Sequence, residues 1–289
     1  MSNRVDAHHH VWRLDRGDYG WLKPTLALSA IYRDFDLADL KPLLAAANVD
    51  ATVLVQAAPT LAETRFLLDV AHESGGLVQG VVGWVDLAAA DAIETLRTLS
   101  NDALLKSIRP MLQDLDDPDW IVRPEVQSAL AALPQLKLRF DALVKPRELK
   151  SLLRTLERHP DLAVVIDHCA KPEIEADRWQ PWADDLAAIA RHSWAHCKLS
   201  GLVNEAGKAW TVDRLRRYSD HVLECFGAER ILWGSDWPVV TLAATYAEWN
   251  AAAEALLAGI SAPDKERIFG NNARRFYGLA QRDKQQEFR

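Results

Sequence analysis

The sequence lacks the features that mark secreted, membrane-spanning and nucleic-acid-binding proteins. Its 289 residues include three cysteines, Cys169, Cys197 and Cys225, which are too widely spaced for a disulfide framework or a CxxC zinc site. No apolar run reaches membrane-spanning length, and the chain does not open on a basic region followed by an apolar one. Lys and Arg total 34 against 41 Asp and Glu, a net charge of −7, without any basic run. We therefore expect a cytoplasmic protein that binds neither membranes nor nucleic acids.

Two common catalytic patterns and all signs of a domain boundary are also missing. The absence of a G-x-S-x-G nucleophile elbow and of a glycine-rich phosphate loop disfavours a serine hydrolase and a dinucleotide enzyme. No linker, low-complexity segment or shift in composition divides the chain. We expect residues 1–289 to form a single domain, with the polar residues 281–289 as a frayed tail.

Short apolar runs alternate with helix-like segments eight times along the chain. The runs predict strands at Arg4–Trp12, Ala51–Ala57, Val78–Asp86, Leu104–Leu112, Lys137–Val144, Ala163–Ala170, His196–Leu202 and Ile231–Trp237. Helices are predicted at Asp36–Asn48 (with Asp36 as its N-cap), Leu61–Ser74, Ala88–Ser100, Glu125–Leu133, Arg147–His159, Trp179–His192, Val212–Phe226 and Leu242–Leu257, and in a further stretch at Ser261–Tyr277. Near-continuous apolar strands are typical of a parallel sheet covered on both faces. Eight of them favour an α/β fold of the (β/α)8 TIM-barrel type, with an extra C-terminal helical segment.

Polar residues occur late in these strands, where a barrel interior should be apolar. The first strand carries His8 and His10, whose side chains point to one face while His9 points to the other. Later strands contribute Arg109, Asp141, His168, Lys198 and Asp236. Active sites of barrels lie at the carboxyl ends of the strands, so we expect these groups to converge there. The two long connections that follow strand ends, 13–35 and 113–124, are expected to form lids or substrate walls.

Each of these residues also has a structural explanation. The histidine pair could be incidental, and His168 could be a satisfied core histidine. Asp236 could cap the turn that Pro238 starts, and Arg109 could be the partner of a buried ion pair. A network on the floor or rim of the barrel would explain three further residues as well as catalysis does: Asp141, Lys198 and Glu205.

Six short motifs resemble, in this order, those of the amidohydrolase superfamily. They are DAHHHVW at 6–12, GWVD at 83–86, IRP at 108–110, DHCAKP at 167–172, KLSGL at 198–202 and GSDWP at 234–238, and they are followed by Asn271-Asn272-Ala273. The nearest branch is that of the sugar lactonases, such as L-fuconolactonase and L-rhamnonolactonase, to which 2-pyrone-4,6-dicarboxylate lactonase is related. The resemblance covers nearly the whole chain, and its motifs are specific in combination rather than singly.

This resemblance implies a (β/α)8 barrel that opens the ring of a lactone, first of all a sugar-acid lactone of the L-fucono or L-rhamnono type. By position, His8 and His10 match the family's first-strand pair, His168 its sixth-strand histidine and Asp236 its eighth-strand carboxylate. These four are the predicted catalytic residues: Asp236 activates water and the histidines polarise the carbonyl group. The predicted substrate contacts are Arg109, Trp84, Trp120 and Trp237.

One departure from the wider superfamily bears on the cofactor. A binuclear site needs a carboxylated lysine or a glutamate on the fourth strand and a histidine on the fifth, but the predicted fifth strand has no histidine and Lys106 comes early in the fourth. The sequence therefore predicts no required cofactor, or one divalent ion, zinc first, held by His8 and His10. The partner is a small-molecule lactone, and a homo-oligomer is compatible with the sequence. Alternatives are a pyrone or muconolactone lactonase, a metal-dependent decarboxylase or hydratase, and a non-catalytic barrel that binds a small acid or sugar.

Overall fold

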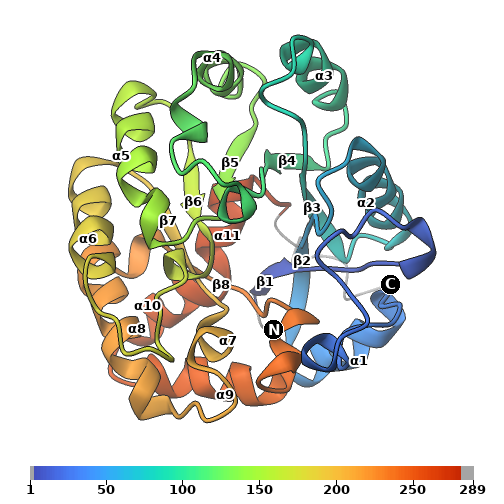
Figure 1. Cartoon of the computed structure of the whole chain (residues 1–289). Coiled ribbons are helices and arrows are strands. Elements are labelled where there is room, and N and C mark those ends of the chain that lie inside the picture. Colours follow the sequence, from blue (N-terminus) through green and yellow to red (C-terminus); the bar gives the residue numbers. More distant parts are fainter. Residues whose placement is uncertain (1–2, 281–289) are drawn as a thin grey trace.

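Eight parallel strands form the centre of the molecule, and helices surround them (Figure 1). The computed structural model describes residues 3–280, so the expected frayed tail, 281–289, lies outside the described residues. The strands are β1 (Arg4–His9), β2 (Val49–Val55), β3 (Val78–Gly83), β4 (Leu105–Ile108), β5 (Arg139–Ala142), β6 (Val164–Ile166), β7 (His196–Leu199) and β8 (Ile231–Trp233). Each strand pairs with the next in the sequence, and a bridge between His9 and Trp237 joins the eighth strand segment to the first. The predicted (β/α)8 barrel is confirmed.

The helices lie on the outside of the strands, except for the last one. They are α1 (Leu37–Ala46), α2 (Leu61–Glu73), α3 (Ala92–Leu99), α4 (Pro124–Ala132), α5 (Leu149–Arg158), α6 (Trp182–His192), α7 (Leu202–Ala206), α8 (Val212–Phe226), α9 (Tyr246–Leu256), α10 (Ala262–Glu266) and α11 (Asn272–Tyr277). Asp36 accepts hydrogen bonds from the first backbone amides of α1, so the predicted N-cap is confirmed. The short helix α7 was not predicted, and α9 begins at its Thr245 cap rather than at Leu242. Among residues 3–280, no helix combines the length and the apolar character needed to cross a membrane.

Every strand ends earlier than the sequence predicted, and polar residues such as Arg109, His168 and Asp236 lie beyond the ends of their strands. Strand β6 stops at Ile166, since residues 168–171 adopt left-handed backbone angles, with φ of 50° at His168. Strand β8 stops at Trp233, and Asp236 has a φ of 58°. Non-glycine residues rarely adopt such angles and persist there only when the surrounding structure holds them. Of the four predicted catalytic residues, only His8 therefore lies in a strand; His10 follows the end of β1, and His168 and Asp236 lie in turns.

The C-terminal segment closes the end of the barrel at which the strands begin. Phe276 and Tyr277 of α11 pack with strand residues such as Val53 and Val165 in one apolar cluster inside the barrel. The Phe276 ring also lies 4.8 Å from that of His196, the first residue of β7. A π-helical turn, Arg267–Asn271, leads from α10 to α11 against the start of β1. The opposite end, where the strands finish, is left for the site.

The contact between the π-helical turn and the start of β1 gives a test of the fold. An added Cβ atom at Gly270 would lie 2.0 Å from the backbone oxygen of Asn3, so one of the two backbones must move. We expect Gly270→Ala to lower the free energy of unfolding by about 1–3 kcal/mol, the usual cost of overpacking. Denaturant unfolding measures this, and Gly259→Ala is the control because its Cβ atom would meet nothing within 4 Å. Equal losses in both variants would contradict the tight contact.

Candidate active site

The four predicted catalytic side chains converge around one carboxylate oxygen at the end of the barrel where the strands finish. Oδ1 of Asp236 lies 3.3 Å from Nε2 of His10, 3.7 Å from Nε2 of His8 and 3.8 Å from Nε2 of His168. The two nitrogens of the histidine pair are 3.3 Å apart. All four side chains are buried, and none belongs to a residue more than 5% exposed. A water-sized reactant bound here would meet one acceptor carboxylate and several imidazole nitrogens at once.

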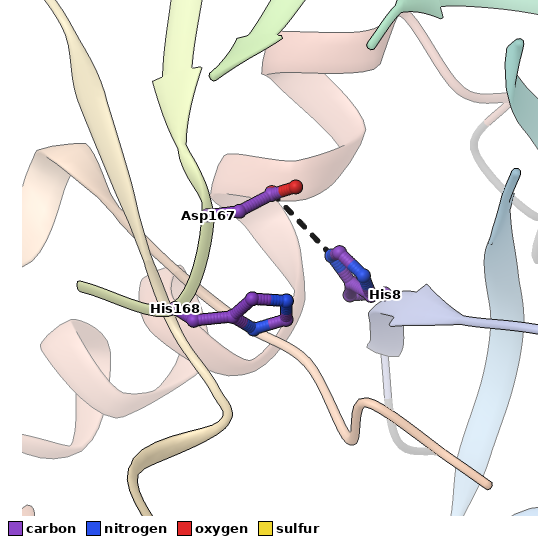
Figure 2. A group of neighbouring side chains, drawn as sticks. All are labelled: His8, Asp167 and His168. Atoms are coloured by element: carbon purple, nitrogen blue, oxygen red, sulfur yellow. Dashed lines mark ion pairs between the residues drawn. The ribbon is translucent and has the colours of Figure 1, made fainter. Parts of the chain in front are cut away.

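Asp167, to which the sequence analysis assigned no role, lies behind His8. Figure 2 shows its carboxylate at the end of β6, pointing to the His8 ring, with His168 as the next residue along the chain. Its Oδ1 atom is 3.4 Å from Nδ1 of His8, and the rings of His8 and His168 are 4.5 Å apart. A signal for Asp167 was present, because a carboxylate that ends an apolar strand run needs a buried partner.

The first strand does not keep a simple alternation of sides. Its register against β2 shifts between Asp6 and His9. Asp6 accepts hydrogen bonds from the Tyr246 hydroxyl of α9 at 3.1 Å and from the Ser235 amide at 2.8 Å, whereas His8 faces Asp167 inside the barrel. Burial raises the pKa of Asp6 to about 6. The shift thus removes Asp6 from the site, although it lies two residues before His8.

The hydrogen bonds of two imidazoles constrain where their protons are. Nδ1 of His10 lies 2.8 Å from the Val55 carbonyl oxygen, which only accepts, so Nδ1 carries the proton and Nε2 presents a lone pair. Nδ1 of His168 lies 2.8 Å from the Ser200 hydroxyl. On the other side of β1, His9 contacts the Thr52 hydroxyl at 2.9 Å, which confirms that it points away from its two neighbours.

The protonation states of the cluster follow from burial and from the neighbouring charges. Burial lowers the pKa of His168 to about 4, so its ring is neutral at pH 7. Burial, and then the Lys198 ammonium, hold the pKa of His8 well below its ordinary value. Burial alone would raise the pKa of Asp236, but the surrounding imidazoles of His168, His10 and His8 outweigh it and lower that pKa. At pH 7 the site therefore combines the ionised carboxylate of Asp236 with the neutral rings of His8 and His168.

Asp141 and Lys198 form a buried network below these four residues. The Lys198 ammonium lies 2.5 Å from Oδ2 of Asp141, 3.0 Å from Oδ1 of Asp167 and 3.1 Å from Nδ1 of His8. The Tyr277 hydroxyl donates to the same Asp141 oxygen at 2.6 Å. Nδ1 of His8 can accept from Lys198 or donate to Asp167. Glu205 does not join this floor network.

Glu205 lies at the rim instead, where it pairs with Lys171 at 3.2 Å. Both side chains are partly exposed there, so their ion pair contributes little to stability. Of the three residues for which the sequence suggested a network, two therefore lie on the floor and one on the rim.

Arg109 turns toward the inner wall of the site. Its Nη1 atom lies 3.1 Å from Oδ2 of Asp167 and 3.4 Å from Nε2 of His8, and its Nη2 atom donates to the Gln56 carbonyl oxygen. The Gln56 side chain returns a hydrogen bond to the Arg109 carbonyl oxygen at 2.7 Å. The buried ion pair that the sequence offered as an alternative is therefore present. Gln56, which the sequence analysis missed, holds the arginine in place.

The three tryptophans predicted to contact the substrate occupy different places. Trp237 follows Asp236 and is buried, with its ring edge-on to Phe35 at 5.2 Å. Trp84 is half-buried after β3, and its amide donates to a threonine of α2. Trp120 is half-buried and begins a 3-10 turn that packs against α4 and α5. The structure thus brings Trp237 next to the catalytic cluster, while the substrate role of all three remains a prediction.

The connection after β1, predicted to be a lid or wall, is tied to the start of α2. Tyr19 donates its hydroxyl to Oε2 of Glu63 at 2.9 Å, and the Arg16 guanidinium lies 3.4 Å from the same oxygen. The indole of Trp21 donates to the Ala57 carbonyl oxygen at 2.7 Å. Burial raises the pKa of Glu63 to about 7. This carboxyl group anchors the connection to α2.

The donor atoms of the cluster fit a single tetrahedral metal ion. A zinc ion with bonds of about 2.0–2.1 Å has ligand atoms about 3.3–3.4 Å apart. The separations among His8, His10 and Asp236 are 3.3, 3.3 and 3.7 Å, and these three residues form one group spaced for a metal. The lone pair on Nε2 of His10 suits this use. A second such group consists of His8, Asp167 and His168, but its carboxylate is already paired with Arg109 and Lys198.

The chain is similar to known proteins over nearly its whole length. The model of a family described as amidohydrolase matches residues 5–279. An L-fucono-1,5-lactonase from Burkholderia ambifaria is 46% identical over 283 residues, 96% of this chain and 97% of that protein. An L-fucono-1,5-lactonase from Burkholderia multivorans is 33% identical over 291 residues, 96% of each chain. The crystal structure of an amidohydrolase from Burkholderia multivorans with bound zinc is 32% identical, covers 96% of this chain and 100% of its own, and has a TM-score of 0.89.

The Glu63 anchor predicts how stability depends on pH. Its pKa in the folded chain, about 7, lies above the ordinary 4.5, so the folded state binds the proton more tightly. The corresponding stabilisation is complete below pH 4.5 and is lost as the pH rises through 7. From pH 5 to pH 8 we expect the unfolding free energy of the wild type to fall by roughly 2–3 kcal/mol relative to Glu63→Gln.

Denaturant unfolding of both proteins across this range measures the difference, in which titrations common to both cancel. The matched control is Glu157→Gln, which changes an exposed carboxylate on α5. Parallel stability curves for Glu63→Gln and the wild type would show that the carboxyl group ionises without cost.

Proposed function

The chain belongs to the amidohydrolase family, and we propose that His8, His10, His168 and Asp236 are the active site with which it hydrolyses sugar-acid lactones. Its activity is that of a carboxylic-ester hydrolase, in line with two relatives that are L-fucono-1,5-lactonases. A lactone of the L-fucono or L-rhamnono type is the proposed substrate, which places the enzyme in carbohydrate metabolism. The observation that carries the proposal is the single Asp236 oxygen that faces three imidazole nitrogens within 3.8 Å.

Asp236 acts as the proton acceptor in the first step. Its lowered pKa keeps it ionised at neutral pH, as a base must be. It takes a proton from the water that attacks the lactone carbonyl carbon. When the bond from that carbon to the ring oxygen breaks, Asp236 returns the proton to the ring oxygen. The product is the open hydroxy acid, and opening the ring makes the reverse reaction slow because the new carboxylic acid ionises.

His168 and His10 have different parts in polarising the carbonyl group. If the Ser200 hydroxyl donates to Nδ1 of His168, Nε2 of that ring carries the proton and can donate to the developing oxyanion. Nε2 of His10 presents a lone pair and cannot donate while the ring is neutral. The Arg109 guanidinium, 3.4 Å from Nε2 of His8, adds positive charge on the same side.

A divalent ion, zinc first, would be held by His8 and His10, with Oδ1 of Asp236 completing the set. When bound, it would supply Lewis-acid polarisation of the carbonyl oxygen. The second oxygen of Asp236 then remains for the proton. Support comes from the ligand spacing and from the zinc in the Burkholderia multivorans structure. The remaining proposed substrate contacts are Arg109, Trp84, Trp120 and Trp237.

Asp236→Asn tests the proposed base. The variant keeps the shape but accepts no proton, so kcat/KM should fall by about 10²- to 10⁴-fold. Acid release from L-fucono-1,5-lactone, L-rhamnono-γ-lactone and a pyrone lactone is followed with a pH indicator. Asp184→Asn on the outer face of α6 is the control and should keep wild-type rates. Undiminished hydrolysis by Asp236→Asn would refute the assignment of the base, and no hydrolysis of any lactone by the wild type would refute the proposed function.

Ser200→Ala tests the separate role of His168. Loss of the hydroxyl group frees Nδ1 of His168, and kcat should fall about 2- to 10-fold because a neutral hydrogen bond contributes roughly 0.5–1.5 kcal/mol. The zinc content should not change, because the metal ligands are untouched. Ser128→Ala on α4 is the matched control. A loss of zinc together with activity would mean instead that His168 holds the metal.

A further inference from the structure

We propose that the Lys198 ammonium is a built-in cation that fills the place of a second metal ion and so limits the site to one divalent ion. This inference rests on the metal site proposed at His8 and His10. It assigns a positioning role to a residue of β7 that touches no reacting atom, and it explains why this barrel would hold one divalent ion rather than two.

The surroundings of the ammonium are those that a metal ion would have. Two carboxylate oxygens, from Asp141 and Asp167, and one imidazole nitrogen, from His8, lie within 2.5–3.1 Å of Nζ. Lys198 and both aspartates are fully buried. Carboxylate oxygens and imidazole nitrogens are common ligands of divalent metals in proteins. A lysine in this cage donates hydrogen bonds to the same carboxylate and imidazole atoms, and it brings one positive charge instead of the two of a divalent ion.

Both oxygens of Asp167 already face side-chain cations. Its Oδ1 atom faces Lys198 at 3.0 Å, and its Oδ2 atom faces the Arg109 guanidinium at 3.1 Å. The group of His8, Asp167 and His168, whose spacing would suit an ion, is therefore already neutralised by two side-chain cations. The group of His8, His10 and Asp236 contains no such cation partner for its carboxylate in the described chain.

The charges of the buried side chains also limit the site to one divalent ion. Counted as formal charges, Arg109 and Lys198 stand against the three carboxylates Asp141, Asp167 and Asp236, which leaves −1 (2 − 3 = −1). Burial raises the pKa of Asp141, so −1 is the most negative charge that these five groups reach. One divalent ion brings the cluster to +1, and a second would bring it to +3. Uncompensated charge in a dry interior costs several kcal/mol for each ion. Removing Lys198 lowers the total by one and empties the cage.

Counting the bound ions tests the inference directly. The wild type and Lys198→Ala are loaded with excess zinc, desalted and measured by native mass spectrometry and elemental analysis. We expect the variant to hold one more zinc ion per chain than the wild type. Lys106→Ala, which removes a half-buried lysine of β4 that lies outside the cage, should match the wild type.

A double variant separates the cage from a general loosening of the barrel. Lys198→Met with Asp141→Asn removes the ammonium and one carboxylate together while filling most of the volume. Its zinc count should equal that of the wild type, because methionine fills the space of the ammonium and the cage has one carboxylate ligand fewer. An extra ion in the double variant would mean that zinc binds wherever the barrel is loosened, and would overturn the proposal.

The outcomes also distinguish this inference from the proposed metal site. The wild-type count tests the site at His8 and His10, whereas the difference between Lys198→Ala and the wild type tests the cage. Two ions in the wild type, or no difference in a folded Lys198→Ala, would overturn the role of Lys198. If Lys198→Ala unfolds, circular dichroism should show that zinc restores its fold, since the ion replaces the ammonium. Failure of zinc to restore it would also refute the proposal.

Discussion

The backbone hydrogen bond from the amide of Asp236 to the carbonyl oxygen of His8, 2.8 Å long, is the constraint on which the site depends. It joins the end of the eighth strand segment to the first strand, and a second bond from His10 to Trp237 extends the join. The residues that close the barrel are thus the residues that meet in the site. Gly234 shows how tight this closure is, because a Cβ atom there would lie 2.7 Å from that of His8.

Buried charge is the second constraint, and the chain meets it with its own cations. Asp167 is flanked by Lys198, His8 and Arg109, and their combined effect outweighs burial and holds its pKa well below the ordinary value. Taking such charges out of water is costly unless each has a partner with good geometry. The left-handed angles of His168 and Asp236 add backbone strain at the same place. The surrounding barrel, with α11 sealing its far end, offsets these costs.

The sequence predicted the elements well and their ends poorly. Apolar runs indicated all eight strands, and Asp36 marked the start of α1 correctly. The predicted sixth strand continues to Ala170, however, although the backbone has turned by His168, because a left-handed turn of non-glycine residues leaves no mark in the composition. The family resemblance drawn from six motifs was confirmed by a match over residues 5–279. Asp167 and Gln56 were missed because their importance lies in partners from distant strands.

By itself the sequence determined the barrel, the family and the convergence of His8, His10, His168 and Asp236 at the carboxyl ends of the strands. These follow from local periodicity and from the rule that parallel strands end on one side. Only the tertiary structure decided that Asp6 leaves the site while His8 enters it, and that Arg109 and Lys198 point at Asp167. The reason is that distances across the barrel depend on the register of all eight strands and on each local shift. The spacing of residues within one segment shows neither the register of the strands nor these local shifts.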